Sequence, residues 1–175
     1  MKARSAPIAA ITAVALVALV ALFWWAPSDP DREGTNPLVG RAAPLIDATD
    51  TAGRPVRIDA YRGKWLLVNF FATWCAPCVK EHPELVRFRA AHRATGDAAV
   101  LSVAYDDEPA AIEAFFTANG GDWPTIATGS DAYILEYGVV KLPESFLIDP
   151  EGVVVHKFVA GVDQASIEAM MVQPS

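Results

Sequence analysis

The stretch WLLVNFFATWCAPC, residues 65–78, joins a run of apolar residues directly to a Cys-x-x-Cys pair. Residues 65–71 are typical of a central strand that is covered on both faces, because Asn69 alone interrupts the apolar run. A helix is predicted to follow through about Ala91. The apolar residues of this helix that are expected to face inward are Val79, Leu85, Val86 and Phe88. The two cysteines therefore lie where a buried strand ends and a helix begins.

This placement of the cysteines points to redox chemistry. A thiol at a helix N-terminus faces unpaired backbone N–H groups and the positive end of the helix dipole, and both stabilise the thiolate. The thiolate is the attacking species in disulfide exchange. We expect the exposed sulfur of Cys75 to attack a target disulfide, and Cys78 to resolve the mixed disulfide. Pro77 falls in the first helical turn, where its missing N–H costs little.

Two other uses of the cysteines fit less well. A structural disulfide across so short a loop adds only about 2 kcal/mol in the chain-entropy model, and a domain of this size does not need it. A zinc site needs four ligands, and the chain offers one Cys-x-x-Cys pair and 3 scattered histidines. Cys78 and His82 share a helix face, yet the ligand set stays incomplete. We therefore predict no metal site and expect His82 to be exposed to solvent.

The remaining sequence alternates strand and helix signals. Parallel strand–helix units are followed by a hairpin around Asp149-Pro150-Glu151-Gly152, so the fold class is predicted to be α/β with a mixed sheet flanked by helices. The expected strands are residues 45–49, 56–58, 99–105, 145–148 and 153–159, the first two forming a hairpin. The expected helices are residues 109–119, residues 130–137 and a last one that starts at Asp163.

Composition excludes several classes of protein. The chain has 175 residues, of which 53% are hydrophobic, with 2 cysteines and a net charge of −7. One domain is expected at this length, and 2 cysteines exclude a disulfide-stapled scaffold. The apolar content excludes general disorder. An acidic chain with no basic cluster is not expected to bind nucleic acid.

Residues 8–26 carry much of the apolar content, with Thr12 as the one polar residue. As a helix of about 1.5 Å per residue, this segment is long enough to cross a bilayer. We expect an uncleaved single-pass anchor rather than a secretory signal peptide, because the apolar run is long and the residues after it form a poor cleavage site. Residues 1–7 are then a cytoplasmic tail, residues 27–44 a proline-rich linker, and residues 45–173 an extracytoplasmic, periplasmic-side domain.

Two motifs carry a family resemblance. Residues 71–78, FATWCAPC, resemble the active-site motif of the thioredoxin superfamily, and Pro83 matches the proline that kinks the helix there. Residues 140–149, VKLPESFLID, resemble the loop that holds the cis-proline of that superfamily. The sequence is similar to the membrane-tethered thiol:disulfide interchange proteins of cytochrome c maturation, of the DsbE/CcmG type, and to their ResA and TlpA relatives. The resemblance covers residues 45–161.

The resemblance implies a thioredoxin-like fold with an active site around Cys75 and Cys78. It implies that Pro143 is cis and faces the cysteine pair, so that the Leu142 backbone can pair with an extended substrate segment. Trp74 and Pro77 belong to the active-site motif. The implied activity is reduction of disulfides in partner proteins such as apocytochrome c. A membrane dithiol reductant of the DsbD or CcdA type would restore the dithiol, with no cofactor.

Two acidic residues are candidates for tuning the thiols. Glu81 lies about one helical turn after Cys78, and Glu144 directly follows Pro143. A carboxylate near a thiol disfavours the thiolate, so both acids are expected to hold the Cys75 pKa near neutral and to assist proton transfer at Cys78. The alternative is that Glu81 is a solvated helix residue. For the Trp123-Pro124 pair, a place in the substrate groove and a buried structural role both stay open.

Other functions remain open from sequence alone. Oxidants and reductants share the Cys-x-x-Cys motif, so a periplasmic disulfide oxidant is an alternative. A peroxiredoxin-like antioxidant would need its threonine three residues before the cysteine, whereas Thr73 is two before Cys75. A copper-handling chaperone would place three residues between the cysteines and add a histidine ligand, and this chain has two between. A redox-inert adaptor would use the fold only for binding.

Overall fold

The computed structural model of the chain describes residue 16 and residues 36–127 and 129–172. The chain divides into two units, residues 1–32 and residues 33–175, and the second unit carries the fold described below. The expected tail, nearly all of the expected anchor at residues 8–26, and the linker up to residue 35 lie outside the described residues. Within the described part of the chain, no helix has the length and apolar character needed to cross a membrane.

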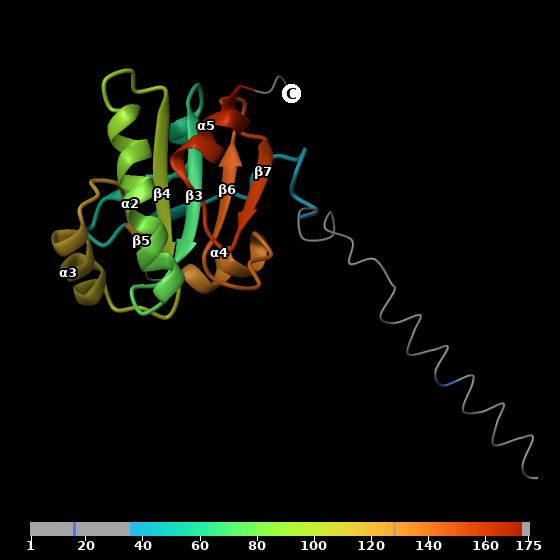
Figure 1. Ribbon diagram of the computed structural model, residues 1–175. Helices are drawn as coiled ribbons and strands as arrows, with labels where there is room; N and C mark the ends of the chain where they lie inside the picture. Colours follow the sequence, from blue (N-terminus) through green and yellow to red (C-terminus); the bar gives the residue numbers. More distant parts are fainter. Residues whose placement is uncertain (1–15, 17–35, 128, 173–175) are drawn as a thin grey trace, which may run out of the picture. The chain divides into compact units, whose positions relative to one another are not determined.

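Five strands form a mixed sheet in the order β5-β4-β3-β6-β7 (Figure 1). The central strand β3 (Trp65–Phe71) pairs in parallel with β4 (Ala98–Ala104) and antiparallel with β6 (Glu144–Ile148). The short strand β5 (Thr125–Ile126) continues the sheet beyond β4 in parallel, and β7 (Val154–Val159) continues it beyond β6 antiparallel. This arrangement confirms the predicted α/β fold with a mixed sheet.

A separate two-stranded hairpin precedes the sheet. Strands β1 (Asp47–Thr49) and β2 (Pro55–Arg57) pair antiparallel, as predicted. Asp50 closes the turn between them, because its Oδ1 accepts the backbone N–H groups of Ala52 at 3.0 Å and Arg54 at 2.8 Å. The helices in chain order are the 3-10 helix η2 (Ile58–Tyr61), α2 (Ala76–Ala91), α3 (Pro109–Asn119), α4 (Ser130–Glu136) and α5 (Gln164–Met171).

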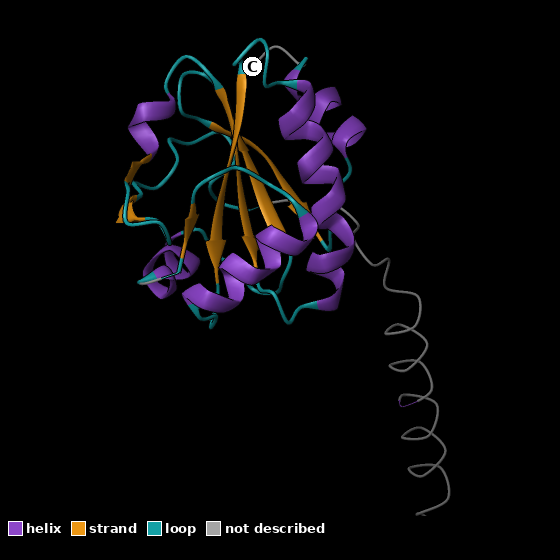
Figure 2. Ribbon diagram, turned by 90° about the vertical axis from the view of Figure 1, so that its left-hand side faces the viewer, coloured by secondary structure: helices purple, strands orange, loops and turns teal. Residues whose placement is uncertain are grey.

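Both faces of β3 are covered, which explains its nearly continuous apolar sequence. Successive side chains of a strand point to opposite faces. Phe70 packs with Tyr137 and Phe146 in a cluster on the side of the hairpin and α4, while Leu67 packs in a second cluster with residues of α2 and α5. Figure 2 shows the sheet between the long helices on one side and the hairpin and short helices on the other.

The β6–β7 hairpin has the turn chemistry that the sequence predicts. Asp149 Oδ1 accepts the backbone N–H of Val153 at 2.8 Å, and Gly152 takes the left-handed conformation with φ of 82°. Asp163 caps the next helix, because its Oδ1 accepts the N–H of Ser166 at 2.9 Å. The segment between β7 and α5 lies beside α2, where the N–H of Val162 donates to Glu81, and it forms one side of the site described below.

The inward face of α2 differs from the prediction. Val79 was expected to face inward, but its exposed fraction is 39%. The buried positions of the helix are Cys78, Glu81, His82, Leu85 and Phe88. These positions recur at intervals of three or four residues, so they form one stripe of a helix with about 3.6 residues per turn. The stripe includes two polar residues: His82, which was expected to be exposed, and Glu81, for which a solvated position was the alternative.

Candidate active site

The cysteine pair lies at the start of α2, directly after β3. Cys75 is the N-cap residue of the helix, and its Sγ accepts the backbone N–H of Cys78 at 3.3 Å. The two cysteines form a disulfide, with 5.2 Å between their Cα atoms. Cys75 is less exposed than expected, at 8%, but more exposed than Cys78 at 2%. A thiolate at Cys75 would receive the same N–H groups and the positive end of the helix dipole.

The loop before the cysteines is held by the loop that follows β4. Asp107 accepts two hydrogen bonds from Thr73, one from the backbone N–H to Oδ2 at 2.6 Å and one from Oγ1 to Oδ1 at 3.0 Å. The indole Nε1 of Trp74 donates to the backbone carbonyl of Asp106 at 3.0 Å. The backbone before Cys75 is thereby fixed, while the Trp74 side chain keeps 60% of its surface exposed.

The loop between α4 and β6 contains a cis peptide bond between Leu142 and Pro143, as the resemblance implied. The carbonyl of Pro143 accepts the backbone N–H of Ala160 at 3.1 Å, which ties this loop to the turn after β7. Leu142 and Cys75 line the same groove. The structure therefore brings the two motifs identified in the sequence, residues 71–78 and residues 140–149, to one place.

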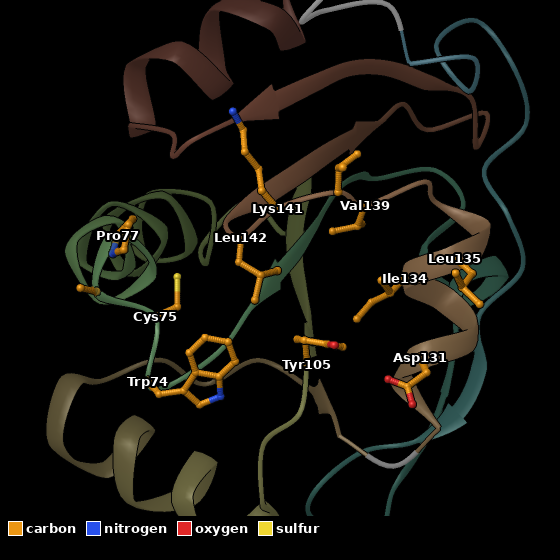
Figure 3. A pocket seen from close by; sticks show the side chains of 12 residues that line it. Trp74, Cys75, Pro77, Tyr105, Asp131, Ile134, Leu135, Val139, Lys141 and Leu142 are labelled. Carbon is orange, nitrogen blue, oxygen red and sulfur yellow. The ribbon is translucent and has the colours of Figure 1, made fainter.

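An apolar groove of about 760 Å³ opens beside Cys75. Figure 3 shows Trp74 and Tyr105 on one side of it, Val139 and Leu142 on the opposite side, and α4 at the far end. Lys141 points away from the cavity in the same view. Several of the lining side chains are both large and exposed to solvent, with exposed fractions of 40–86%: Trp74, Tyr105, Leu135 and Val140. A groove of this kind can bind apolar side chains of a protein segment whose sulfur approaches Cys75.

Glu81 is buried on α2, three residues after Cys78, with an exposed fraction of 6%. Its Oε1 accepts Asn69 Nδ2 at 2.6 Å, and its Oε2 accepts the backbone N–H of Val162 at 3.0 Å. Burial raises the pKa of Glu81 to about 7, and the two hydrogen bonds oppose that rise without cancelling it. The alternative that Glu81 is a solvated helix residue is therefore wrong.

Glu144 is buried as well, but its carboxylate is engaged by a lysine. The Nζ of Lys157 lies 2.8 Å from Glu144 Oε2, and the side chains are 7% and 2% exposed. The same oxygen accepts the backbone N–H of Val140 at 3.3 Å. A tuning effect of Glu144 on the thiols stays a prediction, and Lys157 reduces the negative charge that it can contribute.

Two aromatic residues near the site have structural roles. His82 was expected to be exposed, but its exposed fraction is 3%. It packs against Phe115, Phe116 and Trp123, and its Nε2 lies 2.8 Å from the carbonyl of Gly120, so Nε2 donates. Burial lowers the pKa of His82. Trp123 is also buried and donates to Ser102 Oγ at 2.8 Å, so of its two open roles the structural one is correct.

Three functional candidates were missed at the sequence level. Asn69 is the single polar residue of the predicted central strand, and that interruption was a usable signal. Asp107 precedes the predicted helix at residues 109–119, and nothing in the sequence pattern marks it as a partner of Thr73. Lys157 is the one lysine of a mostly apolar strand, and only the hairpin register brings it near Glu144. Among the described residues, no group of three or more histidine, cysteine, aspartate or glutamate side chains is placed to hold a metal ion.

The fold and the site together define a thioredoxin-fold thiol-disulfide oxidoreductase. Cys75 caps the helix, the cis-proline loop lies beside it, and the disulfide closes the Cys-x-x-Cys pair. The model of the family described as Redoxin matches residues 38–171, which is most of the chain, so the chain belongs to the redoxin family.

The curated relatives carry the same enzyme class in their names. The chain is 34% identical over 120 residues to the thiol-disulfide oxidoreductase ResA of Geobacillus thermodenitrificans, covering 69% of this chain and 68% of the relative. It is 32% identical over 122 residues to ResA of Bacillus subtilis, covering 70% and 67%. It is 29% identical over 133 residues to ResA of Bacillus anthracis, covering 76% of each chain.

Solved structures agree with this assignment. The thioredoxin domain of a thiol-disulfide oxidoreductase from Bacteroides vulgatus superposes with a TM-score of 0.68 at 26% identity, covering 76% of this chain and 97% of that one. A thiol:disulfide interchange protein described as DsbE from Chlorobium tepidum superposes with a TM-score of 0.64 at 26% identity, covering 74% and 89%.

Proposed function

We propose that the protein is a membrane-anchored, extracytoplasmic reductase of disulfides in partner proteins, with apocytochrome c as the expected substrate. Residues 8–26 would form the anchor, and a membrane dithiol reductant of the DsbD or CcdA type would restore the reduced pair. The observation that carries the proposal is that Cys75 Sγ, at the helix N-cap, lines an apolar groove beside the cis-proline loop. The similarity to enzymes named ResA and to a protein described as DsbE also supports a role as a reductase.

Reduction of a partner would take two exchange steps. The Cys75 thiolate attacks one sulfur of the partner disulfide, so the partner S–S bond breaks and its other sulfur leaves as a thiolate. The Cys78 thiolate then attacks Cys75 Sγ in the mixed disulfide. This step releases the second partner sulfur and forms the Cys75–Cys78 disulfide. Two electrons pass to the partner, and two protons end on its thiols.

Glu81 supports the reducing direction. It lies three residues after Cys78 on α2, a spacing that places side chains on one helix face about 5–6 Å apart at Cβ. An ionised carboxylate at this distance opposes a thiolate, so it removes part of the stabilisation that the helix N-terminus gives. Strong oxidants owe their potential to a stabilised reduced thiolate. With a pKa of about 7, Glu81 can also accept the proton of Cys78 before the resolving attack.

The test is a trapping experiment with the full chain in membranes. Cys78→Ser leaves Cys75 able to attack but removes the resolving thiol, so a mixed disulfide with a c-type apocytochrome should accumulate. The matched control is Cys75→Ser, which should trap nothing. Equal yields of adduct from both variants, or adducts that lack every c-type apocytochrome, would contradict the proposal. Labelling of the free Cys75 thiol, in Cys78→Ser chains that carry no adduct, by a membrane-impermeant thiol reagent in intact cells tests the location of the domain.

A further inference from the structure

A charged pair lies inside the domain on the β6–β7 hairpin, next to the groove. Phe146 and Lys157 are opposite each other in the strand register, so Lys157 and Glu144 lie on the same face of the sheet. The Lys157 side chain crosses Phe146, with Nζ 5.3 Å from the ring centroid. It ends 2.8 Å from Glu144 Oε2, where both side chains are less than a tenth exposed.

Both members of this pair also bind the loop that precedes Pro143. Lys157 Nζ donates to the carbonyl of Gly138 at 3.5 Å. Glu144 Oε2 accepts the N–H of Val140 at 3.3 Å as well as the ammonium of Lys157. Two peptide groups of residues 138–142 are therefore held from within the domain. This loop supplies Val139 and Leu142 to the wall of the groove beside Cys75 (Figure 3).

Stability alone does not account for a pair in this position. Removing two charges from water carries a large desolvation cost, and apolar side chains of similar volume commonly fill such a place equally well. An apolar pair, however, would offer no donor to the carbonyl of Gly138 and no acceptor to the N–H of Val140. What the charged pair adds, and an apolar pair would not, is that it holds residues 138–142 in a fixed position.

We propose that Lys157 is a positioning residue for partner recognition: with Glu144 it fixes residues 138–142, so that the groove wall next to Cys75 keeps the shape that receives an extended segment of a protein substrate. The inference rests on the proposed function in one respect, that the substrate is a protein. A small disulfide needs access to Cys75 but not this wall. Replacement of Lys157 should therefore weaken the reaction with protein disulfides and leave the reaction with small disulfides unchanged.

The experiment compares wild type, Lys157→Met and the control Lys64→Met, which removes the charge of an exposed lysine. Methionine keeps an unbranched side chain of similar length without the ammonium group. For Lys157→Met we expect KM for insulin disulfides to rise about tenfold with little change in kcat, and the rate with oxidised glutathione to stay within about twofold. Lys64→Met should match wild type in every assay.

Hydrogen exchange gives a second readout that does not depend on the partner. In Lys157→Met the amides of residues 138–142 should exchange at least about tenfold faster, while the amides of β3 stay protected. Because Lys157→Met removes the cation that faces the buried Glu144 carboxylate, the double variant Lys157→Met/Glu144→Gln covers the case in which the single variant fails to fold. It should show the same faster exchange in residues 138–142.

The outcomes separate this inference from the proposed function. Wild-type exchange rates in residues 138–142 of the folded variants would overturn the inference. So would a KM for insulin within twofold of wild type, or equal losses with insulin and glutathione. Failure of the wild-type protein to reduce any protein disulfide would contradict the proposed function instead, and the exchange measurement would still decide whether Lys157 positions the loop.

Discussion

Glu81 Oε2 accepts the backbone N–H of Val162 at 3.0 Å, which ties the turn after β7 to the helix that begins at the cysteine pair. Two residues earlier, the N–H of Ala160 donates to the carbonyl of Pro143 at 3.1 Å. Residues 160–162 therefore connect the buried carboxyl group to the cis-proline loop. Ala160 takes a left-handed φ of 64°, a conformation that costs a non-glycine residue free energy and that these two hydrogen bonds help to hold.

The first prediction concerns stability and pH. Burial raises the folded-state pKa of Glu81 to about 7 from 4.5, so between these pH values the unfolded chain ionises while the folded one keeps its proton. The free energy of unfolding therefore falls as pH rises through this window, by about 3 kcal/mol for the full shift. Glu81→Gln should remove this fall. Urea denaturation of the oxidised protein between pH 4.5 and pH 8 measures it.

Buried His82 acts in the opposite direction, because a lowered pKa adds stability that is lost as pH falls below about 6.5. Both proteins contain His82, so the difference between wild type and Glu81→Gln isolates the carboxyl group. Parallel stability curves for the two proteins over this pH range would show that Glu81 titrates in the folded state as it does in the unfolded one.

The second prediction concerns the reduced thiols. Glu81→Gln removes a carboxylate that opposes the thiolate, so the pKa of the cysteine pair should fall by about one unit or more. Titration of the ultraviolet absorbance of the thiolates measures this change. Glu84→Gln is the matched control, because it removes a carboxylate of α2 one turn further from Cys78.

Glu144→Gln should move the thiol pKa less than Glu81→Gln does, because Lys157 lies 2.8 Å from the Glu144 carboxylate. If neither Glu81→Gln nor Glu144→Gln changes the pKa of either cysteine, the acids do not tune the site.

The third prediction concerns Trp74. Its side chain is 60% exposed at the edge of the groove, and exposed aromatic residues of this kind often carry much of the binding free energy at interfaces. Trp74→Ala should raise KM for a protein disulfide about tenfold. Val172→Ala, which shortens an apolar side chain that is 82% exposed and lies outside the groove, should leave KM unchanged. Similar KM values for the two variants would show that Trp74 does not contribute to binding of the protein substrate.

The fourth prediction concerns the support of the active-site loop. Asp107 accepts two hydrogen bonds from Thr73, so Asp107→Ala leaves both donors without their partner and should lower the free energy of unfolding by about 1–3 kcal/mol. Glu108→Ala is the neighbouring control, since the N-cap residue Glu108 makes no side-chain capping hydrogen bond. Its effect should stay within about 0.5 kcal/mol. Thermal or urea denaturation measures both variants. If Asp107→Ala and Glu108→Ala lower the free energy of unfolding equally, the effect comes from the lost charge and not from the hydrogen bonds with Thr73.

The fold was largely predictable because its signals are local. The apolar run at residues 65–71, the N-cap position of Cys75 and the turn at Asp149–Gly152 each specify an element without reference to distant residues. The inward face of α2 was assigned by residue type, which placed Val79 inside and His82 outside. Periodicity measured back from Leu85 and Phe88 would have found the true stripe. The strand β5 and the helix η2 are too short to leave a periodic pattern.

The active site was predictable only where its residues are close together in the sequence. Cys75 and Cys78 form such a pair, and the cis bond at Pro143 followed from the resemblance of its loop. The partners of the acids come from distant segments: Asn69 and Val162 for Glu81, Lys157 for Glu144. These contacts depend on strand register and on the packing of α2 against α5, which a single sequence does not specify.

The reduction potential of the Cys75–Cys78 pair tests the central claim most directly. Equilibration of the protein with glutathione or dithiothreitol buffers, followed by separation of the oxidised and reduced forms, gives its value. A partner-reducing enzyme whose thiolate is opposed by Glu81 is predicted to have a potential near or below that of thioredoxin, about −270 mV. A potential near about −120 mV, that of the oxidant DsbA, would contradict the account and identify the protein as a disulfide donor.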